Sequence, residues 1–405
     1  MDALLLLYFA VFGGGGRDFP QAITVDGTGH AIVAGTSASD NFPTSAGAAQ
    51  AKPKARAWTP FLAQLSADGN QRVFATYLGG GAHSYGSATA VGRDGAVCLA
   101  GATSAADFPV TASAAYTKFG GTGGRRGAGD AYVAKFDAAG KLVYASYFGG
   151  ASDEGATSVA MTAAGECVAA GFTTSGNLPT THKAAYEKRP AGKLSGFLAV
   201  FSPDGKQVTY ATYLPHDVSA MQMTAGGICY VAGKEWVSKI GCKGKRAQWS
   251  VAVGSGEGEW TRALALDGTE HVRAVRESGP GKGSIVRLRA KDGHQEGAIP
   301  YGETGFTAVH AVAADGERLW IAGSSGQPER AFVAVLDANG KELMRHDAGD
   351  KGEERIRALA TGPGGTVFAA GEAAEDVFVW KLRINNASGR TAIQTQTTTL
   401  ATLRR

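Results

Sequence analysis

Short runs of alternating apolar and polar residues, separated by glycine-containing turns, follow one another along most of the chain. In one stretch ATSVAMT leads through the turn AAGE to CVAAGF, and after a long insertion GFLAVF leads through SPDG to QVTYATYL. Such alternation between Gly, Asp and Asn turns is typical of half-buried β-strands. Asp-Gly and Asn-Gly pairs supply the positive φ that tight hairpins need. Each stretch therefore predicts four antiparallel strands.

A strand ending in Ala-Gly, or in a close variant, marks successive copies of this unit. The marker ends at Gly35, Gly101, Gly171, Gly233, Gly323 and Gly371, and a degenerate copy, HVRAVR, ends at Arg276. Four strands repeated about every 40 to 70 residues are the signature of a β-propeller, in which each repeat is one blade. The sequence therefore predicts an all-β fold over residues 1–384, a seven-bladed propeller of four-stranded antiparallel blades.

The opening run LLLLYFAVFGGGG, from Leu4 to Gly16, could belong to a membrane-directed segment or to the fold. A secretory signal starts with positive charge and ends in a small-residue cleavage site, but here no Lys or Arg precedes Arg17 and no such site follows. The run is also about half of the ~20 residues that a spanning helix needs. It matches the fourth strand of other copies, and the last copy has only three clear strands. We therefore expect residues 4–12 to complete the last blade and close the ring.

The Thr-rich run RTAIQTQTTTL near the C-terminus competes for that closing position. It is polar, whereas the fourth strands of the other copies are apolar like the N-terminal run. Residues 385–405 are therefore predicted to be a loosely ordered tail, or a linker in a longer chain.

Composition agrees with this architecture and excludes several classes. The 405 residues include 59 glycines, which suits many tight turns, and a hydrophobic fraction of 44% is too high for disorder. A formal charge of +4 predicts neither nucleic-acid binding nor membrane attraction. Four cysteines do not make a disulfide framework. Cys98, Cys167 and Cys229 lie in apolar runs and are interpreted as small buried residues, although a bridge from Cys229 to the nearby Cys242 is conceivable.

The first three copies resemble the bacterial SBBP-type β-propeller repeat. Copy one contains FATYLGG, a variant of the family's pattern YxTYLGG, and copy two contains DAYVAKFDAAGK. The three copies also carry the insertions NFPTSAGAAQ, DFPVTASAAY and NLPTTHKAAY. This specific resemblance covers about Arg17 to Leu214, and beyond it the match is to propellers in general. The resemblance implies a bacterial protein that is exported, displayed on the cell surface or extracellular.

The long insertions and the connections between blades are expected on one face, opposite the Asp-Gly turns. The insertions of copies one to three, residues 37–59, 103–130 and 174–195, hold ten basic against four acidic residues, whereas the rest of the chain holds 30 against 32. Interleaved aromatic residues make this face a candidate surface for an anionic polysaccharide or a protein. The candidate ligand-binding residues are Arg56, Trp58, Tyr116, Arg125, Arg126, Tyr186, Lys188 and Arg189. The alternative is that the basic residues are only solvated and that Phe42, Phe108, Tyr116 and Tyr186 hold the insertions against the blades.

Connections between blades surround the mouth of the central channel and contain carboxylates and histidines. Weak catalytic candidates among them are His83, Asp153, His216 and Asp217. They lack diagnostic metal-ligand spacing, and the chain contains no H-E-x-x-H, C-x-x-C, G-x-S-x-G or P-loop motif. We therefore expect no metal and no cofactor.

These observations favour a non-enzymatic binding or display module, a monomer or part of a longer chain, without nucleic-acid binding or membrane insertion. Two alternatives stay open. One is a propeller enzyme, a polysaccharide lyase or hydrolase acting at the channel mouth. The other is a structural spacer with no ligand.

Overall fold

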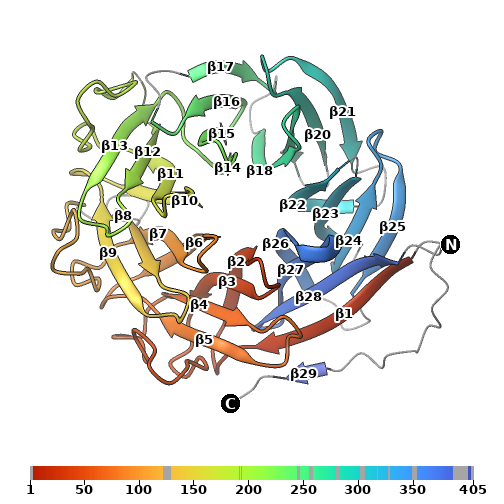
Figure 1. The fold of residues 1–405 in the computed structure, drawn as a ribbon, viewed down its shortest axis with the longest axis horizontal. Coiled ribbons are helices and arrows are strands. Elements are labelled where there is room, and N and C mark those ends of the chain that lie inside the picture. The colour runs from red at the N-terminus through yellow and green to blue at the C-terminus, as the bar shows by residue number, and fades with distance from the viewer. Residues whose placement is uncertain are drawn as a thin grey trace.

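The computed structural model describes residues 3–121, 129–190, 192, 194–243, 247–254, 259–279, 282–301, 306–316, 318–326, 329–348, 354–385 and 400–402. These residues form seven antiparallel sheets arranged as blades around a central channel (Figure 1). The prediction of an all-β, seven-bladed propeller is confirmed. Apart from strands and turns, the described residues contain one short 3-10 turn, η1 (Pro363–Gly365). No helix among them is long and apolar enough to span a membrane.

Within blades one to six the strands follow chain order from the channel outward, and neighbouring strands pair antiparallel. Blade one contains β2 (Asp18–Val25), β3 (Ala31–Ser37), β4 (Thr59–Leu65) and β5 (Arg72–Tyr77). Blade two contains β6 (Ser84–Val91), β7 (Val97–Thr103), β8 (Asp130–Phe136) and β9 (Leu142–Phe148). Blade three contains β10 (Glu154–Met161), β11 (Cys167–Thr173), β12 (Ser195–Phe201) and β13 (Val208–Leu214). Blade four contains β14 (Ala220–Met223), β15 (Ile228–Ala232), β16 (Trp236–Gly241) and β17 (Ala247–Ala252). Blade five contains β18 (Trp260–Asp267), β19 (His271–Gly279), β20 (Lys282–Arg289) and β21 (Gln295–Tyr301). Blade six contains β22 (Phe306–Asp315), β23 (Arg318–Ser325), β24 (Arg330–Leu336) and β25 (Glu342–Asp347). Blade seven contains β26 (Glu354–Gly362), β27 (Thr366–Ala373), β28 (Asp376–Asn385), β1 (Ala3–Phe12) and β29 (Leu400–Thr402).

The two ends of the chain meet in blade seven. β1 pairs antiparallel with β28, so the N-terminal run takes the fourth position and closes the ring, as predicted. β29, which comes from the C-terminal region, pairs in parallel with the outer edge of β1 (Figure 1). β1 therefore holds the closing position, whereas the Thr-rich run that was its competitor lies, except for Leu400, outside the described residues. Closing the ring removes the free sheet edges that the first and last blades would otherwise expose.

The marker glycines stand where the two inner strands of a blade come closest. The pairing of β6 with β7 shifts between Gly86 and Ala88, and that of β10 with β11 shifts between Ala156 and Ser158. Such β-bulges kink the inner strand toward its neighbour. A Cβ on Gly101 would overlap the carbonyl oxygen of Tyr85. Equivalent overlaps occur at Gly35, Gly171, Gly233, Gly323 and Gly371. The Ala-Gly marker is thus a steric requirement of the blade.

The hydrophobic core is divided among the interfaces between neighbouring blades. One cluster joins blades two and three, where Phe148 of β9 packs against Phe197 and Phe201 of β12 with ring centroids 5.1 and 6.0 Å apart. Another joins blades seven and one through Phe12 and Phe61, whose centroids are 6.4 Å apart. Each blade is therefore stabilised by its neighbours rather than by its own sheet alone.

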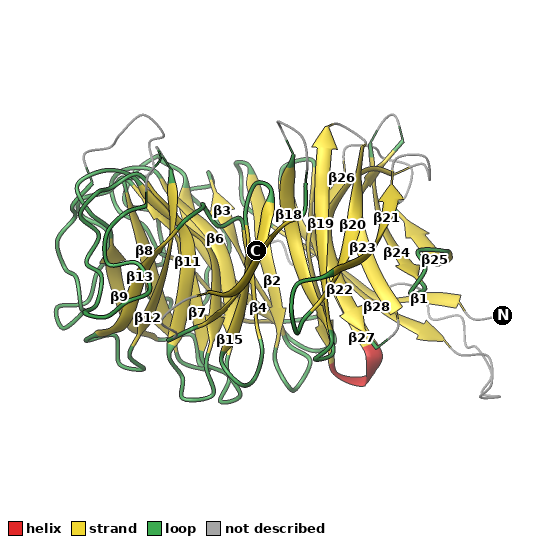
Figure 2. Cartoon of the chain, turned by 90° about the horizontal axis from the view of Figure 1, so that it is seen from above, coloured by secondary structure: helices red, strands yellow, loops and turns green. Residues whose placement is uncertain are grey.

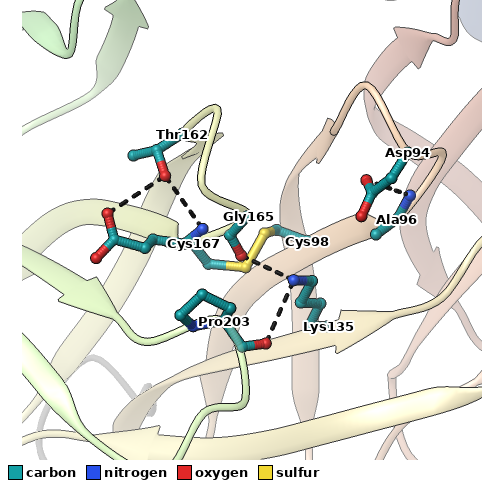
Figure 3. Close-up of a disulfide and its surroundings, with 9 residues drawn as sticks. Asp94, Ala96, Cys98, Lys135, Thr162, Gly165, Cys167 and Pro203 are labelled. Atoms are coloured by element: carbon teal, nitrogen blue, oxygen red, sulfur yellow. Dashed lines mark hydrogen bonds between the residues drawn. A yellow bond between two sulfur atoms is a disulfide. The ribbon is translucent and has the colours of Figure 1, made fainter.

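All four cysteines form disulfides, which corrects the interpretation of Cys98 and Cys167 as separate small buried residues. Cys98 of β7 is bonded to Cys167 of β11, so the bridge links the second strands of blades two and three (Figure 3). Both residues are fully buried, and beside them Lys135 donates hydrogen bonds to the carbonyls of Gly165 and Pro203. Cys229 and Cys242 form the second bridge, the one that the hairpin spacing made conceivable.

Candidate binding site on the long-loop face

The three long insertions begin on the face that carries the connections between blades, but they do not simply project from it. Each folds back along the outer strand of its own blade, and Figure 2 shows this dense loop layer beside β9 and β13. The backbone N–H of Thr111 donates to the Ala145 carbonyl at 2.9 Å, and that of Tyr147 donates to the Tyr116 carbonyl at 3.1 Å. In blades one and three, the backbone N–H groups of Ser45 and Thr181 donate in the same way to the carbonyls of Ala75 and Ala211. The insertions therefore cover the outer edges of β5, β9 and β13.

One tyrosine per blade fixes each insertion. The Tyr147 hydroxyl accepts a hydrogen bond from the Phe108 N–H at 3.1 Å and donates one to the Ala105 carbonyl at 2.9 Å. Tyr77 and Tyr213 make the same pair of bonds in blades one and three. This explains why the Phe-Pro or Leu-Pro insertions occur only in blades whose fourth strand ends in Thr-Tyr or Ser-Tyr before an apolar residue.

Replacing Tyr147 with Phe tests this role. The substitution removes the hydroxyl that bonds both the Phe108 N–H and the Ala105 carbonyl and leaves them only their mutual bond of 3.3 Å, so we expect the free energy of unfolding to fall by about 0.5–1.5 kcal/mol. Tyr213→Phe should cost a similar amount, and the two effects should add because the sites lie in different blades. Urea denaturation measures both. A Tyr147→Phe variant as stable as the parent would show that the insertion is held by other contacts.

A pocket of about 500 Å³ opens on the long-loop face at the first blade. Its walls come from the insertion of blade one and from the connections that precede and follow this blade. Three sequence-predicted residues meet here: the ligand-binding candidates Arg56 and Trp58 and the catalytic candidate His83. Asp40 and Asn41 line the same pocket. The pocket therefore combines an aromatic ring, a cation and several hydrogen-bonding groups.

Contacts beneath the pocket hold its aromatic wall. The Trp58 ring lies edge-to-face against Phe19 with centroids 5.4 Å apart, and the Arg17 guanidinium lies 5.7 Å from the Phe19 ring. The backbone N–H of Trp58 donates a hydrogen bond to His83 Nδ1 at 3.1 Å, and the His83 ring stacks on the Tyr85 ring. Trp58 is half-buried, while Arg56 and His83 are exposed. The tryptophan is thus fixed in place, with the charged groups open to solvent beside it.

The glycine-rich connection from β1 to β2 forms another wall. The Gly15 N–H donates to Asn41 Oδ1 at 2.7 Å, and the Gly16 N–H donates to Ser39 Oγ at 2.9 Å. A Cβ on Gly16 would lie 2.9 Å from the Ala38 carbonyl oxygen, so the close approach requires glycine there. These bonds join the closing strand to the pocket.

The other ligand-binding candidates do not join this pocket. Tyr116 and Tyr186 are half-buried and pack against the core cluster of blades two and three. Arg189 donates to the carbonyls of Thr174 and Gly192 at 2.5 and 2.6 Å, whereas Lys188 is exposed. Arg125 and Arg126 lie outside the described residues.

The remaining catalytic candidates belong to other blade junctions. Asp153 is buried between blades two and three, and the His216 ring packs against Trp236 with centroids 5.0 Å apart. Asp217 follows His216, between blades three and four. Within the described part of the chain, no group of three or more His, Cys, Asp and Glu side chains could hold a metal ion. The candidates are therefore spread over three junctions.

The central channel contains polar residues that the sequence reasoning did not assign to it. Its cavity is about 600 Å³, and bulges in the inner strands other than β14 place residues on the wall, among them Gln21, Arg262, His310 and Arg357. Arg262 and Arg357 pair with Glu277 and Glu372 at 2.6 and 2.7 Å. Burial lowers the pKa of His310 to about 4, and the neighbouring Arg357 adds to the fall. The sequence signal that could have found these residues is the break in alternation at each bulge.

The geometry places this chain in the class of seven-bladed β-propellers with WD40-type structural neighbours. It is similar to the crystal structure of Raptor from Chaetomium thermophilum, with a TM-score of 0.58 and 10% identity, over 94% of this chain and 29% of that one. It is also similar to the Pan2 WD40 domain of Neurospora crassa, with a TM-score of 0.57 and 10% identity, over 93% and 95% of the two chains. No family model and no curated protein matches the sequence. The fold is thus shared with these structures, while the SBBP-type resemblance is not confirmed.

Proposed function

We propose that this chain is a non-enzymatic binding or display module of an exported bacterial protein, and that its first-blade pocket recognises an anionic glycan. The observation that carries the proposal is the meeting of Arg56, Trp58 and His83 in one pocket of about 500 Å³. A fixed aromatic ring offers a surface for the apolar face of a sugar, and an arginine fork binds carboxylate or sulfate groups. Asp40 and Asn41 supply acceptors for sugar hydroxyl groups.

The disulfides support the proposed location. Both bridges, Cys98–Cys167 and Cys229–Cys242, use all the cysteines of the chain. Disulfides persist in oxidising surroundings and are rare in the reducing cytosol. An exported, cell-surface or extracellular protein is therefore the setting that fits these bridges.

A glycan array tests the proposal with acidic and neutral polysaccharides side by side. We expect selective binding to acidic glycans, reduced about tenfold or more in an Arg56→Ala, Trp58→Ala variant, because both contacts act at the centre of the site. Arg93→Ala is the matched control, since Arg93 is an exposed arginine in an Asp-Gly turn on the opposite face. The control should bind like the parent.

Three results would overturn the proposal. Equal binding by the parent and the pocket variant would place recognition elsewhere on the surface. The absence of binding to every glycan would favour a structural spacer. Turnover of a bound polysaccharide would instead favour the propeller enzyme.

A further inference from the structure

Two carboxylates are buried side by side at the junction of blades two and three. Asp130 begins β8 and Glu154 begins β10, and their exposed fractions are 1% and 0%. The sequence analysis placed Asp130 at the end of the insertion of copy two, on the long-loop face. The structure instead encloses both carboxylates beneath the connection that follows β9, where Gly149 and Gly150 lie.

The hydrogen bonds of the pair leave one oxygen without a partner. Asp130 Oδ2 accepts from the Gly120 N–H at 2.7 Å. Glu154 accepts from the Gly150 N–H at 2.7 Å and from the Thr173 hydroxyl at 2.5 Å. Asp130 Oδ1 is buried, and no hydrogen-bond donor among the described residues reaches it with bonding geometry. None of the ion pairs found among the described residues includes either carboxylate.

The unpartnered oxygen faces a small space lined by other oxygens. A Cβ on Gly149 would overlap Asp130 Oδ1 and would lie 2.7 Å from Glu154 Oε2. A Cβ on Gly120 would lie 2.5 Å from the Gly150 carbonyl oxygen and 3.8 Å from Asp130 Oδ1. The two carboxylates thus converge on the position that a Cβ of Gly149 would fill, and the Gly150 carbonyl oxygen lies beside the neighbouring position of a Gly120 Cβ.

The arrangement is specific to certain junctions. Between blades seven and one, Asp376 and Asp18 occupy the corresponding positions, and a Cβ on Gly13 would contact both. Between blades one and two, the same positions hold Thr59 and Ser84. A glycine-rich connection between two blades therefore occurs with or without a pair of acidic residues beneath it.

We propose that Asp130 and Glu154 bind a divalent cation, and that Ca²⁺ fits the site best. Two ionised carboxylates buried together are strongly unfavourable unless a positive charge compensates them. Ca²⁺ accepts carboxylate and backbone carbonyl oxygens in irregular geometry, whereas Mg²⁺ demands a near-ideal octahedron and retains its waters. The Gly150 carbonyl and water would complete the coordination that two carboxylates begin. Burial raises the pKa of Asp130 to about 6, and the Glu154 carboxylate adds to the rise.

Thermal unfolding at pH 8, with CaCl₂ or with a chelator, tests the site. We expect Ca²⁺ at a concentration well above its Kd to raise the Tm of the parent protein by about 3 °C. Asp130→Asn and Glu154→Gln keep the side-chain shapes and should each abolish most of this shift. Asp94→Asn, in an exposed turn on the other face, is the matched control and should keep it.

Calorimetric titration of the folded proteins with Ca²⁺ provides a second readout that does not depend on unfolding. The parent should bind at least one ion more than Asp130→Asn does. A parent whose Tm and heat of titration do not respond to Ca²⁺ would overturn the proposal. A response that both substitutions leave intact would also overturn it, because the ion would then bind elsewhere.

Discussion

Replacing Cys98 and Cys167 together with alanine is expected to lower the free energy of unfolding by about 4 kcal/mol. The bridge spans a sequence separation of 69 residues, and the loop-entropy model assigns a closed loop of this length a stabilisation of about 4 kcal/mol. It also joins the second strands of two neighbouring blades, so its loss removes the only covalent link between them other than the chain itself. Alanine is used rather than serine, because a serine would leave an unpaired hydroxyl group in a buried position.

The second bridge provides the comparison. Cys229 and Cys242 are separated by 13 residues, and the same model gives about 3 kcal/mol for their replacement with alanine. Urea denaturation of the parent and of both double variants measures the two losses. Removal of Cys98–Cys167 that costs less than removal of Cys229–Cys242 would contradict the loop-entropy explanation.

Gly101→Ala is the second substitution with a large expected effect. Its Cβ would overlap the carbonyl oxygen of Tyr85 and lie 2.9 Å from the Tyr132 hydroxyl. Because the carbonyl belongs to the backbone of the bulged inner strand, the strands must move apart. We expect a loss of at least about 3 kcal/mol in the free energy of unfolding.

Gly297→Ala is the matched control for this substitution. Gly297 lies in the outer strand β21, and a Cβ there would have no atom within 4 Å. Its replacement should change the free energy of unfolding by less than about 1 kcal/mol. Equal losses in the two variants would show that the marker glycine is not required by close approach of the strands.

The architecture was predictable because the same physical constraints recur in each blade. Alternation, Asp-Gly turns and the Ala-Gly marker repeat, and the apolar N-terminal run matched the vacant fourth strand. The Cys98–Cys167 bridge was missed because its cysteines are far apart in sequence. Their similar positions in the second strands of adjacent blades were the signal that could have found it.

The candidate site was predictable only in part. Arg56, Trp58 and His83 were identified by residue type, but their meeting in one pocket depends on how the insertion folds, which no local pattern determines. The fold-back of the insertions had a signal in the repeated tyrosines of the fourth strands. The buried Asp130–Glu154 pair had none, since acidic residues in glycine-rich segments are usually solvated.

Titration of an acidic oligosaccharide into the parent protein and into Arg56→Ala, Trp58→Ala, at low and high salt, tests the central claim most directly. The account predicts binding by the parent that weakens as salt rises, because an exposed arginine contributes to it. It predicts a loss of about tenfold or more in the variant, while Arg93→Ala binds like the parent. Unchanged affinity in the pocket variant would contradict the assignment of the first-blade pocket as the recognition site.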